Sequence, residues 1–248
     1  MVRVSRSIVP SFFTVGNMFL GFFSMVSAYG GQFSRAAWMV FFAAFLDLMD
    51  GKIARFTNSA SRFGVEYDSL ADTVSFGLAP SFLLYSLYLK DWGLTGIFLS
   101  FLPLLFGSIR LARFNTQLKG FSKSFFSGFP IPAAALTLAS FVIFSQHYFN
   151  IPVKYPKIML LLIVIVSILM VSTIRYETFP PLRLRGSWLD KLKFFSLMVV
   201  ILALFIYPNQ LLFPFTALYL LSGPARWLIV LSTGDSTLED EVEIESKN

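Results

Sequence analysis

The chain has no cysteine and one histidine among its 248 residues. The absence of cysteine excludes disulfide bonds, zinc-thiolate sites, iron–sulfur clusters and thiol nucleophiles. The single His147 lies beside Tyr148 at the end of an apolar run, and we interpret it as an interfacial side chain rather than a ligand or general base. Chemistry that depends on sulfur ligands or on several imidazoles is therefore outside the reach of this chain.

Charged residues are also scarce. They make up 14% of the chain, whereas 56% of residues are hydrophobic and the mean hydropathy is +0.69. This composition argues against a soluble domain and is typical of a membrane protein with several spans. Since about 20 apolar residues cross a bilayer as a helix, we predict an all-α, polytopic transmembrane bundle. Its spans, about eight in number, are expected near residues 11–29, 35–57, 69–89, 93–114, 129–149, 155–174, 190–207 and 210–232.

The basic residues are distributed unevenly along these predicted spans. With the amino terminus in the cytoplasm, all 20 Lys and Arg residues lie on that side except Arg35, Lys90, Lys154 and Lys157. This asymmetry favours that orientation in the cell (inner) membrane. The net charge of +6 then indicates contact with anionic lipid headgroups rather than with nucleic acid. No small-residue cleavage site follows residues 1–10, so the first span is expected to stay in the membrane.

The predicted domain organisation is simple. Residues 1–234 form one integral membrane domain, because the connections between the spans are short. Residues 235–248 are acidic and lack an apolar face long enough to span a bilayer. We expect them to form a solvated cytoplasmic tail.

One short stretch concentrates acidic and glycine residues within this apolar chain. It reads Asp47-x2-Asp50-Gly51-x2-Ala54-Arg55-x8-Gly64-x3-Asp68-x3-Asp72. Taken as two helices of about 100° per residue, each half presents its carboxylates on one stripe. Polar turn formers within residues 57–61 suit a link that folds the two stripes together. We therefore expect four carboxylates to converge on one point.

Ionisable residues within a membrane are functional by default. All-oxygen ligands from carboxylates suit a hard cation, Mg2+ or Mn2+. A salt-bridge network with Lys52, Arg55 and Arg62 is the structural alternative. Three cations do not account for two one-sided stripes that carry four acids and two glycines, so a metal site is the favoured interpretation.

The motif resembles the signature of the CDP-alcohol phosphotransferases, and every defining position is filled. The resemblance implies an integral membrane enzyme that moves a substituted phosphate from a CDP-linked donor to an alcohol and releases CMP. It also implies a homodimer and a site for two divalent ions. By the same resemblance, Asp47, Asp50, Asp68 and Asp72 surround the metals and Asp72 is also the general base. Gly51 and Gly64 would border the CDP moiety, and Arg55 would contact a donor phosphate.

Three further segments refine this resemblance. Residues 67–80, 110–115 and 128–135 are similar to membrane-integral phosphatidylserine synthases. The implied reaction transfers the phosphatidyl group from CDP-diacylglycerol, or from an archaeal CDP-lipid, to the hydroxyl of L-serine. Arg110 and Arg113 lie one helical turn apart, and arginine suits a carboxylate through its two-point donor geometry. Both are candidates for binding serine, with Asn115 as a neutral donor; the alternatives are lipid-phosphate anchors and a helix cap.

Two other interpretations remain open. The same chemistry is compatible with glycerol 3-phosphate, inositol phosphate, inositol or choline as acceptor. A divalent-cation transporter is the alternative from another class, although acids in a transport path are expected on several spans rather than on one contiguous pair of helices.

The amino-terminal segment departs from the family pattern at one position. Family members often have Asn after the proline, whereas here Pro10 is followed by Ser11, so no nucleotide or structural role is assigned to position 11. Asn17 keeps the pattern and is expected to make a polar contact between helices.

Overall fold

The computed structural model describes residues 11–56, 62–118, 128–149, 156–174, 176, 195, 198–200 and 202–233. Within these ranges every regular element is a helix, which confirms the all-α prediction. The longer helices are α1 (Phe12–Tyr29), α2 (Phe33–Phe56), α3 (Arg62–Asp72), α5 (Gly93–Leu118), α6 (Ile131–Phe149), α7 (Pro156–Val171) and α9 (Pro208–Thr233). Between α3 and α5 lie the π-helical segment η2 (Thr73–Leu78), α4 (Ala79–Leu84), the π-helical segment η3 (Tyr85–Leu89) and the 3-10 turn η4 (Lys90–Trp92).

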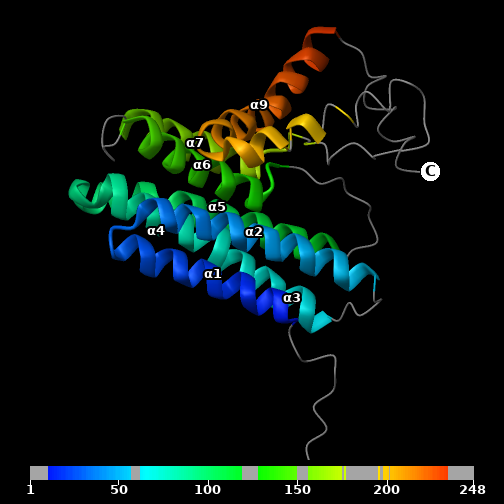
Figure 1. The fold of residues 1–248 in the computed structure, drawn as a ribbon. Coiled ribbons are helices and arrows are strands. Elements are labelled where there is room, and N and C mark those ends of the chain that lie inside the picture. Colours follow the sequence, from blue (N-terminus) through cyan, green and yellow to red (C-terminus); the bar gives the residue numbers. More distant parts are fainter. Residues whose placement is uncertain are drawn as a thin grey trace, which may run out of the picture.

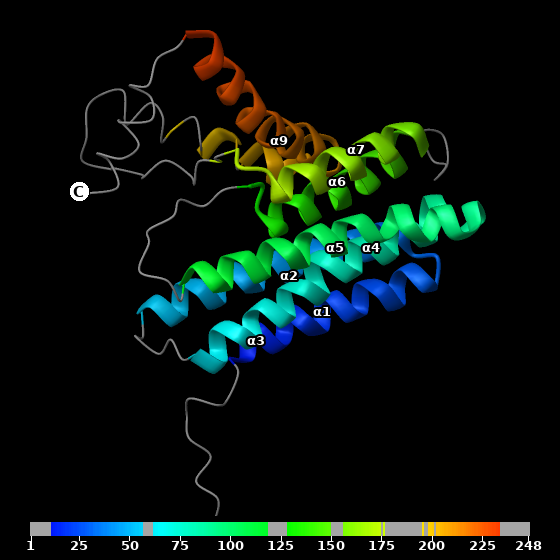
Figure 2. The ribbon, with the colours of Figure 1, turned by 180° about the vertical axis from the view of Figure 1, so that it is seen from behind.

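The helices form two groups (Figure 1). Helices α1 to α5 lie together, and α6, α7 and α9 cover one side of them, as the view from behind also shows (Figure 2). The two groups meet where α2 contacts α6 and α5 contacts α7. Residues on these facing helices, among them Val40, Ile131 and Ile163, are almost completely buried.

Three helical stretches among the described residues are long and apolar enough to cross a membrane: Phe12–Tyr29, Phe63–Thr116 and Ile131–Tyr148. The second contains 54 residues, and a helix of about 20 residues already spans a bilayer. It includes the predicted spans 69–89 and 93–114, and η4 lies at the connection expected between them. A shorter apolar helix covers Lys157–Val171. The predicted acidic tail lies outside the described residues.

Helix α1 shows the packing expected of a helix in lipid. Its buried residues are small or polar: Thr14, Asn17, Gly21, Ser24, Ser27 and Ala28. Its large side chains face outward instead, and Phe12, Phe19 and Phe22 are 83%, 61% and 57% exposed. Small residues at helix interfaces let backbones approach closely where lipid removes the hydrophobic drive for association. The composition of α1 therefore directs its polar face toward the rest of the bundle.

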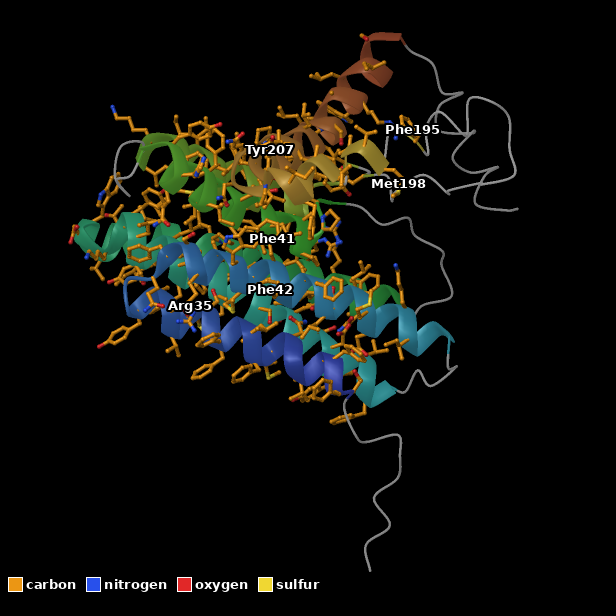
Figure 3. All side chains as sticks on the ribbon, in the orientation of Figure 1. Arg35, Phe41, Phe42, Phe195, Met198 and Tyr207 are labelled. Carbon is orange, nitrogen blue, oxygen red and sulfur yellow. The ribbon has the colours of Figure 1, made fainter. Side chains whose placement is uncertain are left out.

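A tight connection brings distant parts of the sequence to one end of the bundle. Gly30 and Gly31 turn the chain between α1 and α2, and Gly31 has the left-handed φ of 74° that glycine tolerates. The start of α1 therefore lies beside the end of α2, and α3 and the end of α5 lie at the same end of the bundle (Figure 1). Arg35 lies toward the opposite end (Figure 3), with its guanidinium 4.7 Å from the centre of the Phe23 ring.

Candidate active site

Three carboxylates from two helices meet at the end of the bundle where α1 begins. Asp47 projects from α2, and Asp68 and Asp72 project from α3; one oxygen from each lies within 4.8 Å of the others. Asp68 and Asp72 share a helix face because they are four residues apart. Asp72 is 8% exposed, and the other two are half-buried.

The three side chains fit a divalent cation. Like charges at this separation repel one another strongly in an apolar setting, and a bound cation removes that repulsion. Among the described residues, Asp68 Oδ1 is buried without a hydrogen-bond partner, as expected of an oxygen reserved for a ligand. The donor set is entirely oxygen, which matches Mg2+ or Mn2+. The site can therefore hold a hard divalent ion.

Asp50, the fourth candidate carboxylate, is held by the start of α1. Ser11 Oγ donates a hydrogen bond of 2.5 Å to Asp50 Oδ1, and Thr14 Oγ1 donates one to Asp50 Oδ2. Its charge still interacts with those of Asp47 and Asp68. The structure therefore brings three of the four carboxylates together and places the fourth beside them, bonded to another helix.

Asp72 is bonded to α1 as well. Asn17 Nδ2 donates a hydrogen bond of 3.2 Å to Asp72 Oδ1, and Ser75 Oγ donates one of 2.8 Å to the Asn17 backbone carbonyl. Asn17 is fully buried, and its Oδ1 has no hydrogen-bond partner among the described residues. The expected interhelical contact of Asn17 is confirmed. The π-helical segment η2 begins immediately after Asp72, and such segments are frequent at functional sites.

The three candidates for serine recognition lie on α5 and have different surroundings. Arg110 is half-buried, its charge interacts with Asp72, and its Nε has no hydrogen-bond partner among the described residues. Arg113 Nη1 donates to the Val171 carbonyl at the end of α7, at 3.3 Å. Asn115 Nδ2 contacts Ser69 Oγ at 3.0 Å and Glu66 Oε2 at 3.4 Å, so it ties α5 to α3. Arg110 is thus the candidate beside the carboxylates.

The expected nucleotide-binding residues flank the same carboxylates in sequence. Gly51 is exposed and follows Asp50 directly on α2, and Gly64 is half-buried near the start of α3. Arg55 belongs to the last turn of α2, but its side chain lies outside the described part of the chain. A CDP site at these residues stays a prediction.

Sequence reasoning missed the two hydroxyl residues that hold Asp50. Ser11 has a structural role, contrary to expectation: it is the N-cap of α1, where its Oγ accepts a hydrogen bond from the Thr14 amide at 3.2 Å. A serine before a long apolar run is a recognisable capping signal. Its contact with a residue 39 positions away has no local signal.

An aromatic cluster near Arg110 was also missed. The rings of Phe129, Tyr176 and Tyr219 contact one another at centroid distances of 5.0–5.8 Å. The charge of Arg110 interacts with Tyr219, which lies on α9. Only the tertiary structure brings α9 to this end of α5.

The chain is similar to known proteins over most of its length. A family model described as CDP-alcohol phosphatidyltransferase matches residues 7–169. The chain belongs to this family. The matched region contains all four aspartates and the three candidates on α5, whereas α9 lies beyond it. Membership in the family, together with the long apolar helices, identifies a membrane protein.

Several curated relatives carry related names. The chain is 40% identical over 223 residues to a CDP-diacylglycerol–serine O-phosphatidyltransferase of Helicobacter pylori, covering 90% of this chain and 92% of the relative. It is 34% identical over 171 residues to the Bacillus subtilis protein of the same name, covering 69% of this chain and 90% of the relative. It is also 34% identical over 170 residues to an archaetidylserine synthase of Methanothermobacter thermautotrophicus, covering 68% and 69%.

Proposed function

We propose that the protein transfers the phosphatidyl group of CDP-diacylglycerol to the hydroxyl of L-serine, giving phosphatidylserine and CMP. The observation that carries this proposal is 40% identity, over 90% of the chain, to a relative named for that reaction. The carboxylate triad of Asp47, Asp68 and Asp72 supplies matching chemistry. Similarity to an archaetidylserine synthase leaves room for an archaeal CDP-lipid as donor.

The carboxylates divide between metal binding and proton transfer. Asp47, Asp50, Asp68 and Asp72 would hold two Mg2+ or Mn2+ ions, which when bound neutralise charge on the donor's pyrophosphate. Asp72 accepts the proton of the serine hydroxyl. The serine oxygen then forms a bond to the lipid-side phosphorus, and the bond from that phosphorus to the CMP oxygen breaks. The hydrogen bond from Asn17 Nδ2 to Asp72 Oδ1 restrains the orientation of this carboxylate.

The donor and the acceptor contact different residues around this centre in our proposal. Gly51 and Gly64 border the CDP moiety, since residues without side chains permit a close approach, and Arg55 contacts a donor phosphate. Arg110 binds the serine carboxylate, supported by its half-buried position and its interaction with Asp72. Arg113 and Asn115 support the position of Arg110 through their contacts with α7 and α3.

The proposed setting is a multi-pass protein of the inner membrane with the site facing the cytoplasm. We propose about eight spans within residues 1–234, a cytoplasmic acidic tail over residues 235–248, and a homodimer. The distribution of basic residues supports the orientation.

Release of CMP by the purified protein in detergent tests the function. CDP-diacylglycerol and Mn2+ are supplied, with L-serine, glycerol 3-phosphate, inositol phosphate, inositol and choline offered separately. We expect CMP release that depends on serine and on metal. Release with another alcohol alone would refute the assignment of serine, and metal flux into sealed vesicles without any CMP would indicate a transporter. Asp72→Asn protein is the inactive control.

A further inference from the structure

The side chains of Ser11 and Thr14 donate hydrogen bonds to both carboxylate oxygens of Asp50. Ser11 Oγ donates to Oδ1 at 2.5 Å, and Thr14 Oγ1 donates to Oδ2. The two hydroxyl oxygens are themselves 3.1 Å apart. A hydroxyl has one proton to donate, and a carboxylate is a stronger acceptor than a neutral hydroxyl. Both protons therefore go to Asp50, and the plane of its carboxylate is determined by two contacts.

This arrangement exceeds what capping of α1 requires. A cap uses only the acceptor capacity of Ser11 Oγ, which the Thr14 amide satisfies. The two hydroxyl groups instead donate to Asp50 on α2, which is 39 residues from Ser11 and 36 residues from Thr14. Thr14 is 4% exposed, so water competes little for its hydroxyl. Its branched side chain has few rotamers and holds that hydroxyl in place.

The restrained carboxylate stands next to the triad. Asp50 interacts electrostatically with Asp47 and Asp68, so its orientation affects the charge that a cation meets there. Hydrogen bonds to a ligating carboxylate orient it and tune metal affinity. We propose that Ser11 and Thr14 are positioning residues that orient Asp50 for divalent-cation binding. This inference rests on the metal site of the proposed function.

Binding of Mn2+ tests the inference without any substrate. The electron paramagnetic resonance signal of free Mn2+ is titrated with purified protein in detergent. Thr14→Val removes the hydroxyl at nearly constant shape, and Thr14→Ser keeps the hydroxyl and removes the methyl group. We expect Thr14→Val to weaken Mn2+ binding by about 10- to 100-fold, and Thr14→Ser to retain the wild-type affinity.

Ser11→Gly provides a second, independent variant. Glycine is tolerated at N-caps, so this substitution removes the donor to Asp50 while largely preserving α1. We expect a loss of Mn2+ affinity similar to that of Thr14→Val, and this variant decides the question if Thr14→Val does not fold.

The outcomes separate the inference from the function on which it rests. A purely structural tie between α1 and α2 would lower the unfolding temperature of Thr14→Val and Ser11→Gly but leave their Mn2+ affinity unchanged, and that result would overturn the inference alone. A wild-type protein that binds no Mn2+ would overturn both the proposed metal site and the inference.

Discussion

Substituting alanine for glycine at two positions of α1 should have opposite effects. A Cβ atom at Gly21 would lie 2.7 Å from Ser75 Cα and 2.6 Å from Ser75 Oγ. A Cβ atom at Gly16 would meet only Leu46 Cδ1, at 2.8 Å. The first contact involves backbone that cannot move alone, whereas the second involves the far end of a flexible side chain. Gly16→Ala is therefore a matched control for Gly21→Ala.

The expected magnitude follows from these contacts. Both substitutions gain about 1 kcal/mol in helix propensity. Gly21→Ala adds an overpacking cost of about 1–3 kcal/mol, because α1 must move away from η2. With an overpacking cost of about 2 kcal/mol, the Gly21→Ala protein should unfold about 4–8 °C below the Gly16→Ala protein, for a chain of this size.

The displacement of α1 from η2 in Gly21→Ala should also disturb the active site. Ser75 donates to the carbonyl of Asn17, and Asn17 donates to Asp72. We therefore expect Gly21→Ala to lose serine-dependent CMP release and Gly16→Ala to retain it. Thermal unfolding in detergent and the CMP assay measure the two effects. Equal unfolding temperatures and equal activities for the two variants would refute the close approach of α1 to η2.

Three other predictions concern the site itself. Asp72→Asn should lower turnover by at least about 100-fold, the usual contribution of a general base, with an unchanged unfolding temperature; near-normal turnover would disprove the base assignment. Arg110→Leu should raise the KM for serine by about 10- to 100-fold, since a hydrogen bond to a charged group contributes about 1.5–3 kcal/mol. The KM for CDP-diacylglycerol should stay constant. Equal changes in the two KM values would argue against serine binding by Arg110. Asn115→Ala should destabilise the protein by about 1–2 kcal/mol through loss of its contacts with Ser69 and Glu66, and a raised KM for serine at unchanged stability would instead place Asn115 in the acceptor pocket.

Much of the fold was predictable because its signals are local. Apolar runs of sufficient length indicated the described helices. The gaps between the expected spans, at residues 30–34 and 90–92, coincide with connections in the structure. The prediction that the acidic motif forms two helices is also confirmed, since Asp47 lies on α2 and Asp68 and Asp72 lie on α3. Spacing of four residues along a helix was enough to put the last two on one face.

The polar contacts around the carboxylates were less predictable. Asn17 was expected to make an interhelical contact, but its partner Asp72 is 55 residues away. Ser11 was expected to have no role, because it departs from the family pattern; the bond of its hydroxyl to Asp50 has no local signal. Asn115 was interpreted as a serine ligand or a cap, and its hydrogen bond to Ser69 of α3 had no local signal.

The sequence by itself determined the all-helical class, the membrane character and the acidic motif, because each depends on composition or on spacing within one helix. The motif also predicted that Asp47 meets Asp68 and Asp72. The tertiary structure alone decided that Asp50 is held by Ser11 and Thr14, and that the charge of Arg110 interacts with both Asp72 and Tyr219 of α9. These contacts join residues tens of positions apart. The contacts of Asp50 also depend on how closely the small residues of α1 let α1 and α2 approach, which no local pattern encodes.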